Sequence, residues 1–129
     1  MNESNLNQIA IKLSSPPKGI LAADESTNTI SKRFDDIKVE STFENRRVYR
    51  ELLFKTKNLN KFISGVILFD ETIRQSTSNG IPFAKYLNDQ NIFPGIKVDT
   101  GAVKISPDSD EKVTEGLDGL GKRLKEYKE

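Results

Sequence analysis

The sequence predicts an α/β fold in which parallel strands alternate with helices. Three apolar runs of strand length, at 19–23, 62–69 and 95–98, are separated by segments whose apolar residues have helical spacing. Runs that are apolar on both faces are typical of strands buried in a parallel sheet. The 129 residues contain no repeat or linker that would divide them, so one domain, 1–129, is expected.

The first expected element is a helix over residues 6–13, where apolar residues recur on one face and Pro16 follows. The run Gly19–Ala23 is expected to form the first strand, buried on both sides. Residues 24–33 read as a hydroxyl-rich loop that ends in a basic pair.

The second helix is predicted over Thr42–Phe54. Ser41 and Glu44 have the spacing of a capping box, in which each side chain satisfies a free backbone N–H group. The apolar run 62–69 is expected to be a second buried strand.

The last third of the chain has weaker signals. A short helix is expected after Pro82, and a third strand at 95–98 is weakened by Pro94 at its start. Residues 101–111 read as a polar loop. Apolar residues spaced by three and four predict a helix over 113–127, although three glycines weaken it.

The composition excludes several classes of function. Net charge is +1, from 20 basic and 19 acidic residues, so neither a nucleic acid nor an anionic membrane is an expected partner. There is no histidine and no cysteine, so no metal site and no cofactor are expected. The N-terminus lacks the pattern of a signal peptide, which favours a cytoplasmic location.

Charged residues lie at or just past the C-terminal end of each expected strand: Asp24 with Glu25, Asp70 with Glu71, and Lys97 with Asp99. Carboxylates and a lysine at the carboxyl ends of parallel strands can do acid/base work. The alternative is that these strands simply end in solvated polar residues. The hydroxyls and Arg33 of the 24–33 segment suit a phosphate, or else form a hydrogen-bonded turn.

Several segments, with their spacing, resemble the class I fructose-bisphosphate aldolases. They are Lys18–Thr27, Glu44–Phe54, Ile63–Phe69, Pro94–Asp99 and Gly116–Leu120, and they follow one another in the order of that family. The resemblance covers nearly the whole chain.

The resemblance implies a (β/α)₈ TIM barrel, of which this chain would supply the N-terminal part with about three of the eight strands. It implies a glycolytic lyase that reversibly cleaves fructose 1,6-bisphosphate to dihydroxyacetone phosphate and glyceraldehyde 3-phosphate. A lysine Schiff base stabilises the carbanion in such enzymes. That lysine is expected to lie outside this chain. The family resemblance also implies a sugar phosphate substrate and, for the full-length protein, a homotetramer.

The family's site residues map onto particular positions here. Asp24 corresponds to a catalytic aspartate at the end of the first barrel strand. The residues that correspond to substrate-binding positions are Arg33, Thr29, Ser26, Arg46 and Lys97.

By itself, the chain is expected to be inactive and poorly folded, because three strands leave open sheet edges. The alternative function is that of a truncated non-catalytic product, which at most binds a sugar phosphate or a full-length subunit.

Overall fold

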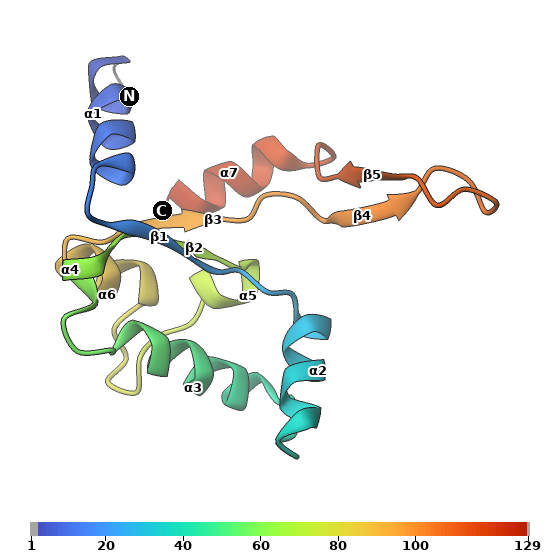
Figure 1. Cartoon of the computed structure of the whole chain (residues 1–129), viewed down its shortest axis with the longest axis horizontal. Coiled ribbons are helices and arrows are strands. Elements are labelled where there is room, and N and C mark those ends of the chain that lie inside the picture. Colours follow the sequence, from blue (N-terminus) through green and yellow to red (C-terminus); the bar gives the residue numbers. More distant parts are fainter. Residues whose placement is uncertain (1–2, 129) are drawn as a thin grey trace. The chain divides into compact units, whose positions relative to one another are not determined.

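The computed structural model describes residues 3–128, which form helices and strands in the alternating order that the sequence predicts (Figure 1). The chain separates after Ile96 into two compact units, each described here by itself. The first unit contains α1 Glu3–Ser14, β1 Gly19–Ala23, α2 Thr27–Asp36, α3 Phe43–Phe54, α4 Leu59–Phe62, β2 Ile63–Leu68, α5 Asp70–Ile73, α6 Phe83–Asp89 and β3 Phe93–Ile96. The second contains β4 Gly101–Lys104, β5 Lys112–Glu115 and α7 Leu120–Lys128.

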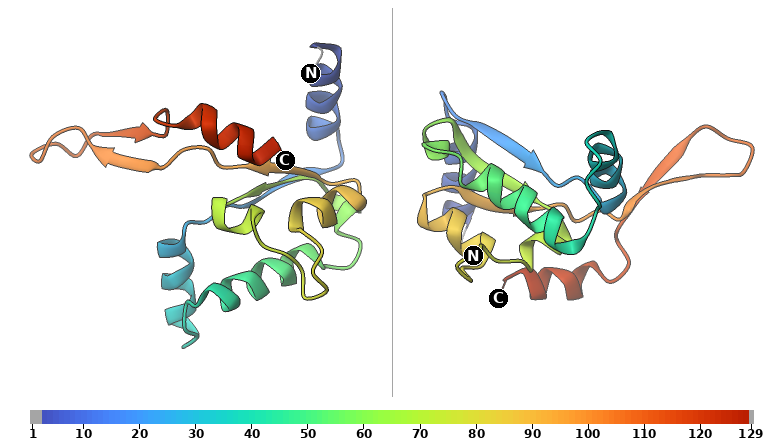
Figure 2. Two further views of the ribbon diagram at one scale, coloured as in Figure 1. Left: turned by 180° about the vertical axis from the view of Figure 1, so that it is seen from behind. Right: turned by 90° about the horizontal axis from the view of Figure 1, so that it is seen from below.

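The first unit is built on a parallel sheet with the strand order β1-β2-β3. Leu21 pairs with Val66, and Val66 with Pro94. Helices α2, α3 and α4 connect β1 to β2, while α5 and α6 connect β2 to β3, and α3 to α6 lie on one side of the sheet (Figure 2). The predicted α/β class is confirmed. Because the strands are parallel, their carboxyl ends meet at one edge of the sheet.

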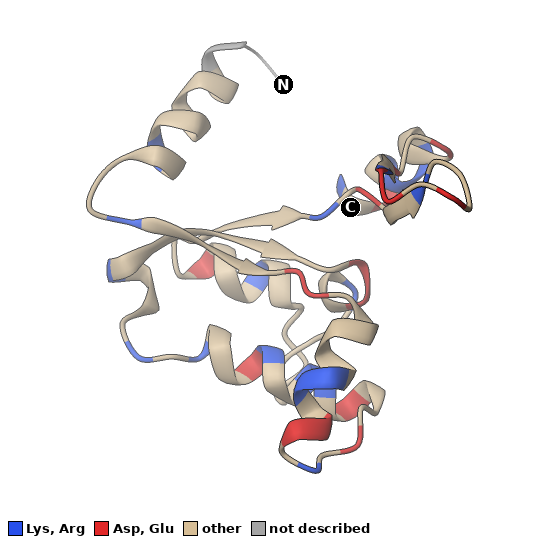
Figure 3. Cartoon of the chain, turned by 45° about the vertical axis from the view of Figure 1, so that its right-hand side comes forward, with Lys and Arg blue, Asp and Glu red and all other residues tan. Residues whose placement is uncertain are grey.

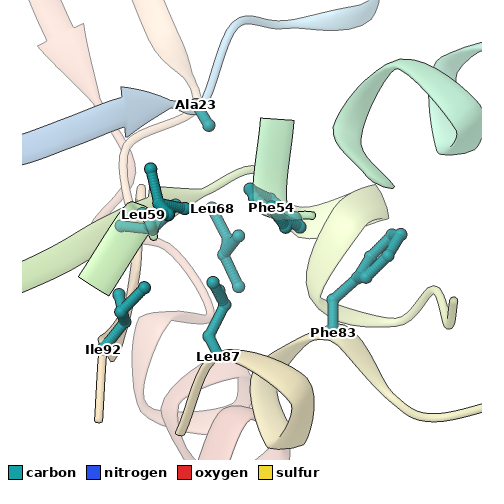
Figure 4. Close-up of a cluster of buried hydrophobic side chains, with 8 residues drawn as sticks. Ala23, Phe54, Leu59, Leu68, Phe83, Leu87 and Ile92 are labelled. Carbon is teal, nitrogen blue, oxygen red and sulfur yellow. The ribbon is translucent and has the colours of Figure 1, made fainter. Parts of the chain in front are cut away.

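The core lies between the sheet and the helices that cover it. Phe54 ends α3 and Phe83 begins α6, and their rings meet edge to face with centroids 5.1 Å apart. Figure 4 shows side chains from strands and helices converging on this cluster. Its buried members are Ala23, Phe54, Leu59, Val66, Leu68, Phe83, Leu87 and Ile92.

Burial on both faces is observed for one strand and not for the other. In β2, Ser64, Val66 and Leu68 are buried on one face and Gly65 is buried on the other, whereas Ile20 in β1 is 52% exposed. The prediction for β1 was therefore wrong. The reason is that, within residues 3–128, β1 has β2 as its only neighbour in this sheet, so less of its surface is covered.

Helix α3 has the predicted span, but its N-cap lies one residue later than expected. Thr42 Oγ1 accepts a hydrogen bond from the Asn45 backbone N–H at 3.0 Å. The prediction of a capping box formed by Ser41 and Glu44 was therefore wrong. Glu44 instead forms an ion pair with Arg47 at 2.6 Å, so its carboxylate binds a side chain within the helix.

Replacing Thr42 with alanine is expected to lower the free energy of unfolding by about 1 kcal/mol, because the Asn45 N–H loses its acceptor. Ser41→Ala is the matched control, since the Ser41 hydroxyl caps no N–H of this helix and accepts only a long hydrogen bond of 3.3 Å from Arg46 Nη1. Urea unfolding followed by circular dichroism measures both. An equal or larger loss for Ser41→Ala would contradict the assignment of the cap.

Residues 27–36 form helix α2, where the sequence reading expected a loop. Ser26 is the N-cap, and Ile30 and Phe34 are buried four residues apart. The many hydroxyls masked this helical spacing. Ser and Thr compete with the backbone for hydrogen bonds within a helix, but they favour its N-terminus.

Strand β3 covers Phe93–Ile96 and so begins two residues before the expected 95–98. Pro94 lies inside it, which is possible because β3 is at the edge of the sheet that residues 3–128 form, so one side of its backbone needs no donor there.

In the second unit, β4 and β5 form an antiparallel hairpin in which Val103 pairs with Val113. The prediction of a polar loop over 101–111 was therefore wrong, because β4 lies there. The prediction of a helix from Val113 was also wrong, because Val113 lies in β5. Helix α7 begins only at Leu120, after Gly116 and Gly119, whose φ angles are 142° and 67°. These left-handed conformations suit glycine and interrupt a helix.

Candidate functional site

The carboxyl edge of the sheet carries the acidic residues that the sequence singled out. Asp24 and Glu25 follow β1, while Asp70 and Glu71 form the first turn of α5 directly after β2. Lys97 and Asp99 follow β3 but belong to the second unit. The parallel topology thus gathers the first four residues at one edge.

Of the four acidic residues that follow β1 and β2, Asp24 is the least engaged by its surroundings. Its side chain is half-buried, and among residues 3–128 no hydrogen bond or ion pair engages its carboxylate. A carboxylate in this state can accept or donate a proton without first breaking an internal contact.

Glu25 lies between two arginines. Arg50, from α3, donates one hydrogen bond to Glu25 Oε2 and a second, of 2.8 Å, to the Glu25 backbone carbonyl. Arg33, from α2, donates to Glu25 Oε1 and lies 3.4 Å from the hydroxyl of Tyr49. Burial alone would raise the pKa of Glu25. Its hydrogen bonds and the charges of both arginines outweigh burial, so the pKa is lowered and the residue is anionic at neutral pH.

The N-terminus of α2 brings Ser26 and Thr29 together. Their hydroxyl oxygens are 3.2 Å apart, and the Thr29 N–H donates to Ser26 Oγ at 3.4 Å. Arg33 follows Thr29 by one helical turn. Two hydroxyls, a helix N-terminus and a guanidinium form a set that suits a phosphate oxygen.

Arg46 is held differently from Arg33. Its Nε and Nη2 donate to the two carboxylate oxygens of Glu71 at 2.8 and 2.7 Å, and its Nη1 donates to the Ser41 carbonyl. This bidentate pair ties α3 to α5. The guanidinium therefore already has protein partners, and a substrate anion would have to displace Glu71.

Lys97 forms an ion pair with Asp99 in the second unit. Asp99 also accepts a hydrogen bond of 3.1 Å from the Gly101 N–H. The pKa of Asp99 is lowered, first by its hydrogen bond with Lys97. The ammonium of Lys97 is thereby fixed near the start of β4.

A second buried acid, Glu51, was missed from the sequence. It accepts hydrogen bonds from Arg47 at 2.6 Å and from the N–H and hydroxyl of Ser78, both at 2.8 Å, and it pairs with Lys55 at 2.5 Å. These contacts anchor the turn at Ser78 to α3. The spacing of Arg47, Glu51 and Lys55 by four residues was the available signal.

Burial raises the pKa of Glu51, but its hydrogen bonds from Lys55, Ser78 and Arg47 outweigh burial and hold it far below the ordinary value of 4.5. Folding stability from Glu51 is therefore complete above that ordinary value and is lost as the pH falls below it. We expect the free energy of unfolding of the wild type to fall more between pH 7 and pH 3 than that of Glu51→Gln. Urea titrations at both pH values measure this difference. Equal losses would contradict the assignment.

Charges of both signs are mixed on the helices of the first unit (Figure 3). On α3, Glu44, Arg47 and Glu51 alternate in sign and pair with one another.

Between residues 3 and 128 there is no helix with the length and apolar character needed to cross a membrane.

Comparison with known proteins relates this site to a family. A family model described as "Glycolytic: Fructose-bisphosphate aldolase class-I" matches residues 5–129. Fructose-bisphosphate aldolase 2 of Plasmodium berghei is 60% identical over 122 residues, which are 95% of this chain and 33% of that protein. The probable fructose-bisphosphate aldolase class 1 of Xanthomonas campestris pv. campestris is 57% identical over 127 residues, 98% of this chain and 38% of the relative.

A solved structure gives the same relationship in three dimensions. It is a ternary co-crystal structure of fructose-bisphosphate aldolase from Plasmodium falciparum in complex with TRAP and a small molecule inhibitor. It matches with a TM-score of 0.91 and 58% sequence identity, over 97% of this chain and 36% of that chain. The chain thus spans about a third of the length of the relatives it matches.

Proposed function

Because the chain belongs to the class I fructose-bisphosphate aldolase family, we propose that it forms part of a glycolytic lyase. The reaction is the reversible cleavage of fructose 1,6-bisphosphate to dihydroxyacetone phosphate and glyceraldehyde 3-phosphate. The observation that carries this proposal is the family match over residues 5–129. The chain spans about a third of the length of its relatives. In this proposal, the remaining strands of the barrel and the Schiff-base lysine therefore lie outside these 129 residues.

In this proposal, Asp24 is the catalytic residue that the chain contributes. Its position directly after β1 is where the catalytic groups of such barrels lie. A carboxylate free of internal partners can move a proton at the carbinolamine oxygen, or at the hydroxyl of the carbon that leaves as the aldehyde when the carbon–carbon bond breaks.

Ser26, Thr29 and Arg33 form the proposed phosphate subsite. Support comes from the 3.2 Å separation of the two hydroxyls and from the exposed guanidinium one turn later. The helix N-terminus adds backbone N–H groups that favour an anion.

Arg46 and Lys97 are also proposed to contact the substrate. Each has an acidic partner, Glu71 for Arg46 and Asp99 for Lys97. A substrate phosphate would have to replace that carboxylate before either side chain could bind it.

For the family member that contains these residues, we propose a homotetrameric assembly and a cytoplasmic location.

The test compares two products of the native gene: the protein made from its whole reading frame, and the 129-residue chain. Both are assayed for cleavage of fructose 1,6-bisphosphate, and borohydride reduction traps any Schiff base with the substrate. We expect turnover and trapping with the first product and neither with the second. If neither product shows turnover or trapping, while the short chain still binds sugar phosphate or a full-length subunit, the alternative of a non-catalytic binding module would hold.

A further inference from the structure

The single carboxylate of Glu25 serves two guanidinium groups whose surroundings differ. The side chain of Arg50 is 3% exposed and that of Arg33 is 53% exposed. Arg50 donates to Oε2 and Arg33 donates to Oε1, so the two arginines bind different oxygens of the same carboxylate. Two cations against one anion leave one positive charge in the cluster.

We propose that Arg50 is a positioning residue that makes Arg33 available to a phosphate group, because it keeps Glu25 neutralised when Arg33 leaves. This inference rests on the phosphate-binding role proposed for Arg33. It assigns the two arginines different roles: Arg50 stays bound to Glu25, whereas Arg33 can leave Glu25 and bind the phosphate.

The energetic argument begins with Glu25, whose side chain is only 16% exposed. A largely buried carboxylate that loses its only cation is strongly destabilised. If Arg33 were the sole partner, its transfer to a phosphate would carry that cost. With Arg50 in place, Glu25 keeps a cation when Arg33 leaves. The departure then breaks one ion pair whose guanidinium is already 53% exposed, and a contact of 3.4 Å with Tyr49.

The structure also explains why Arg50 does not leave with Arg33. The guanidinium carbon of Arg50 lies 5.4 Å from the centre of the Tyr49 ring, a cation–π contact. Tyr49 itself packs edge to face on Phe34, with centroids 5.8 Å apart. A further hydrogen bond of 2.8 Å joins Arg50 to the Glu25 carbonyl. Arg50 is thus held by an aromatic ring, a side chain and the backbone.

The experiment titrates the protein made from the whole reading frame with inorganic phosphate and follows the arginine Nε–Hε signals by NMR. We expect the Arg33 signal to shift to saturation while the Arg50 signal stays in place. Arg50→Met, which keeps the apolar volume but removes the cation, is expected to weaken phosphate binding by about tenfold, because Arg33 is then retained by Glu25. The double variant Glu25→Gln/Arg50→Met is expected to regain at least the wild-type affinity.

Recovery in the double variant separates this proposal from a merely structural role, since a second change to a damaged core would not restore binding. Arg50→Lys, which retains the cation but loses the second hydrogen bond and the stacked guanidinium, is expected to weaken phosphate binding less than Arg50→Met does. Arg33→Gln abolishes saturable binding in every background, and Lys85→Met, on the exposed side of α6, leaves it unchanged. The proposal is overturned if the double variant binds no better than Arg50→Met, or if the Arg50 signal shifts instead of that of Arg33.

The two proposals fail in different ways. An inactive product of the whole reading frame would refute the proposed reaction and leave the phosphate titrations of the variants as they are. The absence of recovery in the double variant would refute the role of Arg50 and leave the aldolase activity of the wild type untouched.

Discussion

Asp24→Asn is expected to lower kcat of the active aldolase by about 10²- to 10⁴-fold, the range that general acid–base catalysis contributes. Asparagine has nearly the shape of aspartate but does not exchange a proton at neutral pH. Because no ion pair or hydrogen bond from the described residues engages the Asp24 carboxylate, the change should leave folding nearly intact. Steady-state cleavage of fructose 1,6-bisphosphate measures the loss.

The control for this prediction is Asp36→Asn at the exposed end of α2, which removes the same charge away from the strand ends. It should retain wild-type kcat. If Asp24→Asn also retained it, Asp24 would be an ordinary polar strand end, which is the alternative that its position alone left open.

Phe54→Ala is expected to lower the free energy of unfolding by about 3–5 kcal/mol, the usual cost of removing a buried aromatic ring. Phe54 is fully buried and loses both its edge-to-face contact with Phe83 and its place beside Leu68 (Figure 4). Against the few kcal/mol of stability of a small domain, this loss is large. Urea unfolding followed by circular dichroism measures it as a shift of the midpoint.

Leu52→Ala provides the matched control on the same helix, because Leu52 is 70% exposed in this chain. It should change the free energy of unfolding by less than about 0.5 kcal/mol. A comparable loss for Leu52→Ala would mean that this face of α3 is covered in solution. Little change for Phe54→Ala would mean that the core shown here does not form.

Local patterns predicted much of the first unit. The apolar runs placed β1 and β2, and periodicity with a hydroxyl before it placed α3 almost to the residue. Prediction was poorer where two local signals compete. Ser26 and its neighbours read as a loop because hydroxyls suit turns, although Ile30 and Phe34 bury one face of α2. In the second unit, helical spacing predicted a helix from Val113, but the hairpin pairing with Val103 prevailed.

The candidate site shows the same division between local and tertiary information. Asp24, Ser26, Thr29 and Arg33 are close in the chain, so the sequence alone indicated a polar segment after a strand. No sequence pattern paired Glu25 with Arg50, or Arg46 with Glu71, because each pair is separated by 25 residues. Such pairs depend on where the helices pack.

The sequence by itself determined the α/β class, the alternation of strands and helices, and the residue types at the strand ends, because these follow from short-range periodicity and composition. Only the tertiary structure decided which charges meet. It buried Arg50 and left Arg33 exposed on the same carboxylate, a difference that comes from the packing of α2 and α3 and not from the arginines themselves. The environment of a charged group, rather than its identity, decides whether it is a fixed partner or is free to bind a ligand.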